Sequence, residues 1–489
     1  MFNRFIERLF IPPVQYAAFG AVIGFYFLFN THIAAAIAVF IFSFVSLCFF
    51  RVLSSLNNES RPLYAANISF AAFTAGLVIG LCAADAGRNE INFGIPVERV
   101  VAVEGVLLED PRIISGGSVM ALLSLRKCAG EGGLRVSGSG DIAVFFPQED
   151  TQKLREFGRG TNVFAEGVIR SSQRGYSISA GSLHIVKPAS GIEKMRTGIR
   201  LKLINIFDGK LWGGLALALL LGVRDNLDSD FTASYRGAGL SYILALSGMH
   251  LAIITALISF LLKKPLGLKA SAITGAVIII LYCLLVGPMP SLNRSAIMYV
   301  LGVLAILGAL PKKPLSILSL SFLIQIIFTP AAGNSLSFIL SYLALFGILI
   351  IGKALSFLFA GKVPDFLLQP LSLSCGAFLA TAGICSFTFG TIAPVGIIAG
   401  LLIVPLTTVF MIGSIIWLVL DFVSLSFLLN WPLSVLYRLM EVIASVAGNM
   451  PGISANFILI LVLSLVLSLL IVVFEYKRRE ALLKMEPFI

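Results

Sequence analysis

The chain has few charged residues, few histidines and no closely spaced cysteine pair. Charged residues make up 12% of its 489 residues, against about 25% in soluble domains, which excludes an ordinary soluble protein. The three histidines, His32, His184 and His250, are widely separated and give no metal-ligand spacing. The six cysteines form no CxxC motif, so no disulfide framework is indicated. We therefore expect neither a metal ion nor another cofactor.

A nucleotide-binding loop is also missing. Residues 347–354 nearly spell a phosphate-binding loop, but Ala354 stands where the Ser or Thr that binds magnesium belongs. The segment also ends an apolar run instead of opening a helix. The chain is therefore not expected to hydrolyse ATP.

Long hydrophobic runs are abundant in this sequence. Hydrophobic residues reach 58%, against about 45–50% in soluble domains, and about 20 apolar residues span a bilayer. This composition predicts a polytopic α-helical membrane protein with about twelve spans. The candidate spans are residues 14–30, 32–50, 63–82, 240–262, 270–286, 292–310, 315–328, 336–351, 366–389, 394–420, 423–448 and 457–474.

The net charge of +11 falls mostly in short loops. If the chain crosses at every candidate span, these basic loops all lie on one side, which the positive-inside rule assigns to the cytoplasm. Both termini are then cytoplasmic, in a multi-pass protein of the inner membrane. The basic and then apolar start of the chain is interpreted as a retained anchor.

Residues 84–210 differ in character from the rest and are placed outside the cytoplasm. Five segments alternate apolar and polar residues, are rich in Val, Ile and Phe, and therefore predict strands. The segments are 98–108, 118–128, 141–146, 162–170 and 176–186. Five short strands suit a small closed barrel such as an OB-fold, although a sandwich has the same strand count.

The segment that follows predicts two unusual helices. Residues 190–211 are amphipathic and are expected to lie flat on the outer membrane surface. Residues 215–221 are apolar but too short to cross, which predicts a re-entrant or half-buried helix covered by protein or lining a cavity. The expected division is residues 1–83 for the N-terminal transmembrane helices, 84–189 for the extracytoplasmic β domain, 190–238 for the helical linker, 239–476 for the main transmembrane domain and 477–489 for a cytoplasmic tail.

Two polar residues interrupt the run at 240–262. Ser247 and His250 are three residues apart and would share one face of a helix. They could line a polar path, or they could form hydrogen bonds between packed helices, a common use of such residues in membranes. Gly248 beside them slightly favours close packing.

Arg294 is the strongest polar outlier. It follows a proline-rich segment and Ser291, which together mark a helix start. A cation in the first turn opposes the helix dipole and needs a partner, such as a carboxylate from residues 225–230 or the phosphates of a substrate. The alternative is that the side chain snorkels to lipid headgroups.

The predicted β domain mixes basic and aromatic residues, as single-stranded nucleic-acid binding requires. Acidic residues are nearly as frequent there, and the aromatics could all belong to the core, so the pattern is weak. The candidate nucleic-acid-binding residues are Arg126, Lys127, Arg155, Arg159, Arg170, Arg174 and Tyr176.

Several motifs resemble those of the ComEC competence family. LGVRDNL at 221–227 and GLSYILALSGMH at 239–250 resemble its LLGDRSxL and GLSHLLAISGLH segments. GPMPSLNRSAIM at 287–298, FILSYLA at 338–344 and the FG…VPL pattern at 389–406 resemble three further motifs in the same order. Departures include Val223, Met249 and Ser295.

The resemblance implies a competence-type channel that conducts single-stranded DNA through the inner membrane during natural transformation. It also implies a DNA receptor, a separate nuclease and a cytoplasmic motor as partners, because many members carry a metallo-β-lactamase-like nuclease domain and this sequence has no HxHxDH motif. We expect no catalysis. The candidate pore residues are Asp225, Arg236, Ser247, Gly248, His250, Ser291, Arg294 and Ser341.

Two other functions remain open from the residues. A small-molecule or lipid-linked transporter on the same scaffold would be favoured by pseudo-symmetric halves, and no such repeat is visible. A membrane-embedded hydrolase using Ser247 and His250 lacks a third catalytic member. Asp225 and Asp228 are expected to hold Arg294 or Arg236 in place.

Overall fold

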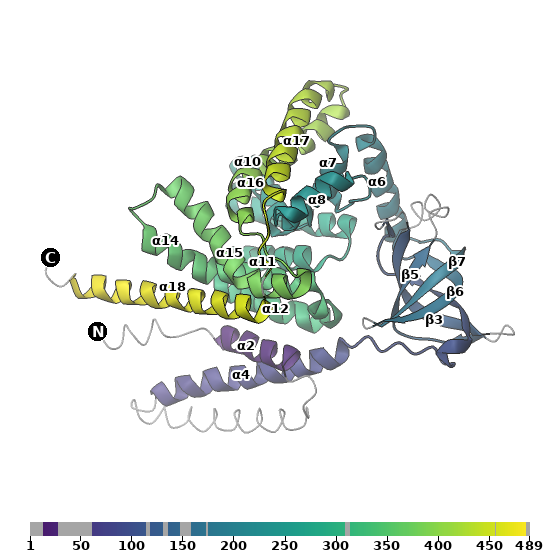
Figure 1. Cartoon of the computed structure of the whole chain (residues 1–489), viewed down its shortest axis with the longest axis horizontal. Coiled ribbons are helices and arrows are strands. Elements are labelled where there is room, and N and C mark those ends of the chain that lie inside the picture. The colour runs from purple at the N-terminus through teal and green to yellow at the C-terminus, as the bar shows by residue number, and fades with distance from the viewer. Residues whose placement is uncertain are drawn as a thin grey trace.

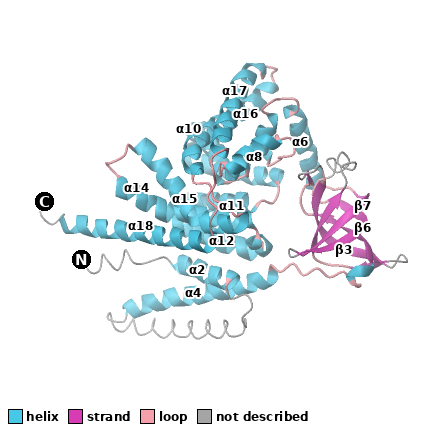
Figure 2. Ribbon diagram, viewed as in Figure 1, coloured by secondary structure: helices cyan, strands magenta, loops and turns pink. Residues whose placement is uncertain are grey.

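The structure is a computed structural model that describes residues 13–27, 61–113, 118–130, 135–146, 158–172, 175–308, 313–454 and 456–485. Helices make up most of the molecule, and the strands gather in one β domain beside them (Figure 1). Colouring by secondary structure shows the same separation (Figure 2). The candidate span at residues 32–50 lies outside the described residues.

All five predicted strands form. They are β1 (Val100–Leu107), β3 (Val119–Gly130), β5 (Asp141–Phe146), β6 (Asn162–Ser172) and β7 (Gly175–Lys187). Two short strands, β2 (Arg112–Ile113) and β4 (Arg135–Ser137), pair with β3. They were not predicted, because two or three residues are too few to show an alternating pattern.

The five long strands close into a barrel. β1 pairs with β3 and β6, β6 with β7, β7 with β5, and β5 with β3, which completes the ring. Of these pairs only β5 and β7 run parallel. Val103, Leu123, Ile142, Val163 and Ile178 are fully buried inside. The closed ring confirms the predicted barrel and rules out the sandwich.

Eight helices in the described part of the chain are long and apolar enough to cross a bilayer by length and composition. One more, α12 (Pro314–Phe328), is apolar but shorter. The eight include α4 (Arg61–Ala86), α10 (Gly248–Val286), α11 (Pro290–Leu307), α15 (Asp365–Phe389), α16 (Val395–Asp421), α17 (Phe427–Gly448) and α18 (Phe457–Met485). The eighth joins α13 (Leu336–Gly347) to α14 (Lys353–Phe359) through the π-helical turn Ile348–Gly352. The figure of about twelve spans stays a prediction.

α10 contains a break that fits two of the predicted spans. Gly267 has φ 75° and ψ 175°, outside the helical region, and Pro265 lies just before it. The residues on either side, 248–266 and 268–286, each form about 28 Å of helix at 1.5 Å per residue. Each half alone therefore matches the thickness of a bilayer core.

The predicted span at 240–262 is wrong at its start. A four-residue helix, α9 (Ser241–Leu244), precedes an extended segment, and α10 begins only at Gly248. Ser247 has φ −132° and ψ 172° and is the N-cap of α10. Ser is a strong cap former, and here its capping preference outweighs the hydrophobicity of the surrounding run.

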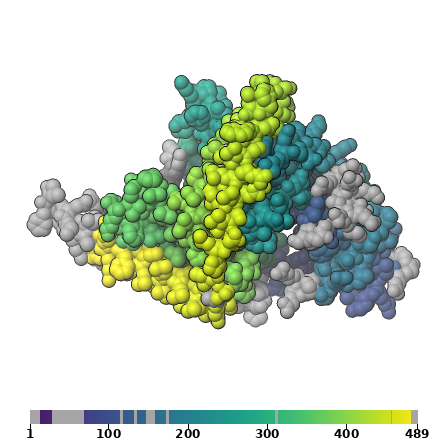
Figure 3. All heavy atoms as spheres, turned by 45° about the horizontal axis from the view of Figure 1, so that its top comes forward, coloured from purple at the N-terminus to yellow at the C-terminus, as the bar shows by residue number. Residues whose placement is uncertain are grey.

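The short apolar helix between the β domain and the membrane helices is buried, as predicted. α7 (Gly213–Leu221) has eight of its nine residues buried, and it packs in the largest hydrophobic cluster with residues of α16 and α17. It is preceded by α6 (Ile192–Phe207) and followed by α8 (Ser229–Gly237), which packs against α17. Figure 3 shows α17 crossing the face of the molecule beside these segments. Protein therefore covers the helix on its sides, as the absence of water in a bilayer requires.

The first described helix, α2 (Pro13–Tyr26), packs closely on α4. A Cβ added at Gly20 would lie 2.0 Å from the Phe73 carbonyl oxygen, and one at Gly76 would lie 1.8 Å from that of Ala17. Small residues on both helices therefore allow backbone contact, the usual way in which membrane helices associate.

Candidate functional site

A group of buried and half-buried polar residues lies where α10, α11, α12 and α13 meet. We call this group the polar cluster. Its members are Ser247, His250, Ser291, Arg294, Ser295, Ser321, Gln325, Ser341 and Tyr342. Five of the eight predicted pore residues belong to it, and Gly248 lies against it. Buried polar groups of this kind are costly at membrane depth and mark functional sites.

Ser247 and His250 form the start of α10. The His250 Nδ1 atom accepts a hydrogen bond from the Ser247 backbone N–H at 3.0 Å, and the Met249 N–H donates to the Ser247 hydroxyl at 3.3 Å. This is a capping box, with the histidine in place of the usual Glu or Gln. The two side chains lie together as predicted, but Ser247 is the cap before the helix and not a residue on its face.

The His250 ring is fully buried, and its Nε2 atom has no partner among the described residues. The Ser247 hydroxyl lies 3.1 Å from Nδ1, a contact that a nucleophile would need. However, Nδ1 already accepts the backbone N–H, so it is committed to the cap. The geometry gives no support to a serine hydrolase.

Ser291 links α11 to the extended segment at residues 245–247, between α9 and α10. Its hydroxyl donates to the Leu246 carbonyl at 2.6 Å, and the Ser295 hydroxyl donates back to the Ser291 carbonyl at 3.0 Å. The Leu246 carbonyl lies in the extended segment between α9 and α10, and no backbone N–H of the described residues donates to it. The hydrogen bond from Ser291 therefore satisfies the Leu246 carbonyl, which the extended segment leaves without a helical N–H.

Arg294 is 7% exposed and lies in the second turn of α11. Its guanidinium donates to the Ser341 carbonyl and, at 3.3 Å, to the Ser295 hydroxyl, and it lies 5.7 Å from the centre of the Tyr342 ring. The Nε atom has no partner in the described part of the chain. Ser341 therefore contributes its backbone oxygen, whereas the prediction concerned its side chain.

No carboxylate contacts Arg294 among the residues that the structure describes. The predicted pairing with Asp225 or Asp228 is wrong. Asp225 accepts from the Ile113 N–H of β2 at 3.3 Å, and Asp228 is the N-cap of α8. Arg236 is exposed in the last turn of α8. The carboxylates nearest in sequence to the cluster are thus used elsewhere.

Gly248 lets α10 and α11 approach. A Cβ added there would lie 2.7 Å from the Ser295 hydroxyl and 2.9 Å from Arg294 Nη2. A glycine at the start of α10 therefore leaves room for the guanidinium.

Three members of the cluster were not predicted from the sequence, namely Ser321 and Gln325 of α12 and Tyr342 of α13. Tyr342 donates to Gln325 Oε1 at 3.0 Å, and Gln325 Nε2 donates to the Pro290 carbonyl at 2.9 Å. The Ser321 hydroxyl lies 3.3 Å from the Tyr342 hydroxyl. Gln325 was the available signal, since an amide within an apolar run needs a partner.

Some of the candidate nucleic-acid-binding residues of the β domain lie beside acidic side chains, and others are exposed. Lys127 lies 4.0 Å from Glu104, and Arg159 lies 3.7 Å from Glu193. Arg126, Arg170 and Tyr176 are exposed. Strand pairing places Arg170 opposite Ser177 and Ser171 opposite Tyr176, at one end of the β6–β7 hairpin. Arg155 and Arg174 lie outside the described residues.

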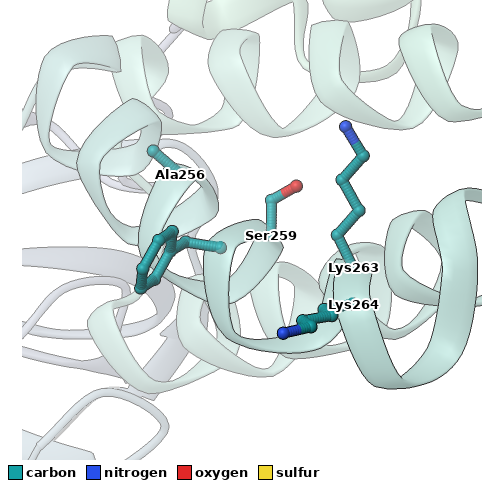
Figure 4. A pocket seen from close by; sticks show the side chains of 5 residues that line it. Ala256, Ser259, Lys263 and Lys264 are labelled. Atoms are coloured by element: carbon teal, nitrogen blue, oxygen red, sulfur yellow. The ribbon is translucent and has the colours of Figure 1, made fainter.

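An open pocket of about 580 Å³ lies away from the polar cluster. Ala256, Ser259, Phe260, Lys263 and Lys264 line it along one stretch of α10, just before the break at Gly267 (Figure 4). None of them belongs to the cluster. Within the described residues no group of three or more His, Cys, Asp or Glu side chains could hold a metal ion.

Comparison with known proteins identifies the family. A profile described as Competence protein matches residues 219–479, which is more than half of the chain and includes the whole polar cluster. The chain belongs to the Competence protein family. The described helices that are long enough to span a bilayer agree with a membrane protein of this family. The barrel and α6 lie before the matched residues.

Two relatives share shorter stretches with this chain. It is 30% identical over 137 residues to ComE operon protein 3 of Bacillus subtilis, covering 26% of this chain and 17% of that protein. It is 28% identical over 232 residues to an uncharacterized protein of Aquifex aeolicus, covering 46% of this chain and 53% of that protein. The matches thus span about half or less of the relatives' lengths. No solved structure matches the chain.

Proposed function

We propose that this protein is a DNA-uptake channel that conducts single-stranded DNA across the inner membrane, with the polar cluster as part of its path. The observation that carries the proposal is Arg294. It is buried among membrane-length helices, and in the described part of the chain only a carbonyl, a hydroxyl and an aromatic ring contact its guanidinium.

These contacts leave the positive charge of Arg294 without a counter-charge. Burying an ion without one is costly, whether in a protein interior or in a bilayer. A phosphodiester passing between α10, α11 and α13 would supply the negative charge, and arginine forms strong bidentate contacts with phosphate. Membership of the Competence protein family supports this choice of anion.

The proposal places the cluster in a closed arrangement. Ser291, Arg294 and Tyr342 link their helices through direct contacts, so passage of a strand requires these contacts to open. The exchange of the Ser341 carbonyl for a phosphate oxygen would lower the cost of opening, because the new partner carries a charge.

The remaining parts of the proposal concern orientation and partners. The β domain lies outside the cytoplasm and receives the strand from a DNA receptor, and both termini are cytoplasmic. A separate nuclease degrades the other strand, and a cytoplasmic motor supplies the force. The chain itself has no catalytic role in this scheme. The exposed Arg126, Arg170 and Tyr176 are the β-domain residues proposed to contact DNA.

Replacing Arg294 tests the proposal. Arg294→Ala should lower uptake of labelled DNA by about 100-fold, since a lost charge-assisted contact is worth up to about 3 kcal/mol. Uptake is measured in cells that carry the variant as their only copy, at matched protein abundance in the membrane.

Arg438→Ala is the matched control, because Arg438 is an exposed arginine that pairs with Glu441 on α17. It should leave uptake unchanged. Wild-type uptake in the Arg294→Ala strain would overturn the proposal.

A further inference from the structure

The β domain and the polar cluster are linked through one buried arginine on α6. Arg196 lies in the segment 190–211, which was expected to lie flat on the membrane surface, yet its side chain is only 4% exposed. Its guanidinium points at two different parts of the molecule. On one side it contacts the β domain, and on the other it contacts the end of α10.

Toward the β domain, Arg196 contacts Asp110, which lies between β1 and β2. Arg196 donates to the two carboxylate oxygens at 3.0 and 2.5 Å. Arg200 Nε lies 3.4 Å from the same carboxylate, and the Arg159 backbone N–H donates to it at 3.1 Å. Two-point contact between a guanidinium and a carboxylate fixes direction as well as distance.

The charge state of Asp110 supports this contact. Burial opposes ionisation, but the hydrogen bonds from Arg196 and the charges of Arg200 and Arg196 outweigh it. They lower the pKa of Asp110 below its ordinary value of 3.8. The carboxylate is therefore charged throughout the neutral range.

Toward the membrane helices, Arg196 completes the end of α10. Its Nε donates to the Leu285 carbonyl at 2.9 Å and its Nη2 to the Val286 carbonyl at 3.1 Å. These are carbonyls of the last turn, which have no partner within their helix. Gly287 follows with φ 99°, and a Cβ there would lie 2.9 Å from Arg196 Nη2. Glycine thus supplies both the backbone conformation and the space.

The chain continues from this point directly into the polar cluster. Gly287 is followed by Pro288, Met289 and Pro290, and α11 starts at Pro290. Proline fixes its own φ near −65°, so this connection is short and stiff. Ser291 and Arg294 lie in the first two turns of α11. A shift at Leu285 and Val286 would therefore move Arg294 relative to the Ser341 carbonyl.

We propose that Arg196 is a positioning residue that couples the β domain, through Asp110, to the placement of Arg294. The consequence for transport rests on the proposed function, whereas the coupling itself does not. If the contact is lost, the end of α10 shifts and Arg294 no longer lies where a passing strand would meet it, so transport falls.

Hydrogen exchange tests the coupling without DNA. The full chain is placed in lipid nanodiscs, and exchange of backbone amides is followed at residues 284–298. Arg196→Lys keeps the charge but loses the two-point contact, and Asp110→Asn changes only the β-domain side. Both should speed exchange in this segment by about tenfold, the effect of one lost hydrogen bond to a charged group.

Strands β6 and β7 serve as an internal reference for folding of the β domain. Their exchange should remain that of the wild type in Arg196→Lys, and Arg438→Lys should change neither region. If Asp110→Asn speeds exchange in β6 and β7 as well, it disturbs folding of the β domain, and the coupling is then judged from Arg196→Lys alone. Unchanged exchange at 284–298 in Arg196→Lys would overturn the proposal.

The double variant separates coupling from two independent effects. Asp110→Asn with Arg196→Lys should speed exchange no more than either change alone, because both break the same contact. Effects that multiply would overturn the proposal.

A transport measurement adds a readout that a stabilising contact alone would not move. Arg196→Lys should lower DNA uptake while the affinity of the nanodisc-bound chain for single-stranded DNA stays that of the wild type. Loss of affinity in parallel with uptake would count against coupling. If Arg294→Ala leaves uptake intact, the channel proposal fails while the exchange result still stands.

Discussion

The polar cluster and the contact between α6 and the β domain each bury an arginine, but they surround it differently. Arg196 faces the carboxylates of Asp110 and Glu193 and two helix-end carbonyls. Arg294 faces one carbonyl, one hydroxyl and an aromatic ring. A neutralised arginine holds parts together, whereas an un-neutralised one remains able to bind an anion. The difference supports the joining role proposed for Arg196 and the binding role proposed for Arg294.

Methionine at each position should separate the two roles most strongly. Arg196→Met leaves Asp110 buried with weaker partners, and removal of one member of a buried pair costs about 3–5 kcal/mol. Arg294→Met removes a charge that has no counter-ion among the described residues and should change the free energy of unfolding by less than about 1 kcal/mol. Denaturant unfolding in detergent micelles measures both. Equal losses would erase the distinction between the two arginines.

Acid should loosen the Asp110 contact and leave the polar cluster unchanged. Because the folded pKa lies below 3.8, the contact stabilises the protein fully above that value and less as pH falls through the folded pKa. The thermal unfolding temperature of the wild type should therefore fall below about pH 4. Asp110→Asn should show a smaller fall over the same range. Identical pH profiles would show that Asp110 does not contribute.

Glycine replacement tests how tightly the cluster packs around Arg294. Gly248→Ala would place a methyl group within 3 Å of the Ser295 hydroxyl and Arg294 Nη2, and overpacking costs about 1–3 kcal/mol. Both neighbours are ends of flexible side chains, so the low end of that range is expected.

Gly302→Ala is the matched control, since a Cβ at Gly302 meets nothing within 4 Å. It should be neutral or slightly stabilising, because Ala favours helix more than Gly does. A loss at Gly302 equal to that at Gly248 would show that helix propensity, not contact with Arg294, decides.

Local patterns predicted the β domain well. Alternation of apolar and polar residues located the five long strands because each has one face in the core. Segment length predicted the burial of α7, since an apolar segment too short to cross the bilayer must be covered by protein. Strand number suited a barrel but did not exclude a sandwich, and the pairing of β1 with both β3 and β6 shows the closed barrel.

The polar cluster was predicted only in part. Arg294 and Ser291 were found because a charge beside a helix start stands out in an apolar run. The break at 245–247 was missed, since hydropathy over a long window does not register three extended residues. The predicted carboxylate partner of Arg294 was wrong, because Asp225 accepts a hydrogen bond from β2 and Asp228 caps α8. Gln325 and Tyr342 come from α12 and α13, and no local pattern brings them to Arg294.

Arg196 shows the same limit from the opposite direction. In an amphipathic helix on a membrane surface, a charged residue is expected to be exposed. In α6 the apolar Ile192, Met195 and Ile199 are exposed, whereas Arg196 is buried. Asp110 lies 86 residues away in the sequence. Only the packing of the β domain against α6 shows that this charge is buried and paired.

Site-specific crosslinking during uptake tests the binding role of the polar cluster most directly. A photoreactive amino acid in place of Ser341, which lends its carbonyl to Arg294, reports whether DNA passes within contact distance. The same substitution at Leu463, an exposed apolar position on α18, is the control. The account predicts crosslinks to single-stranded DNA from position 341 and none from position 463. Active uptake with no crosslink at 341 would contradict it.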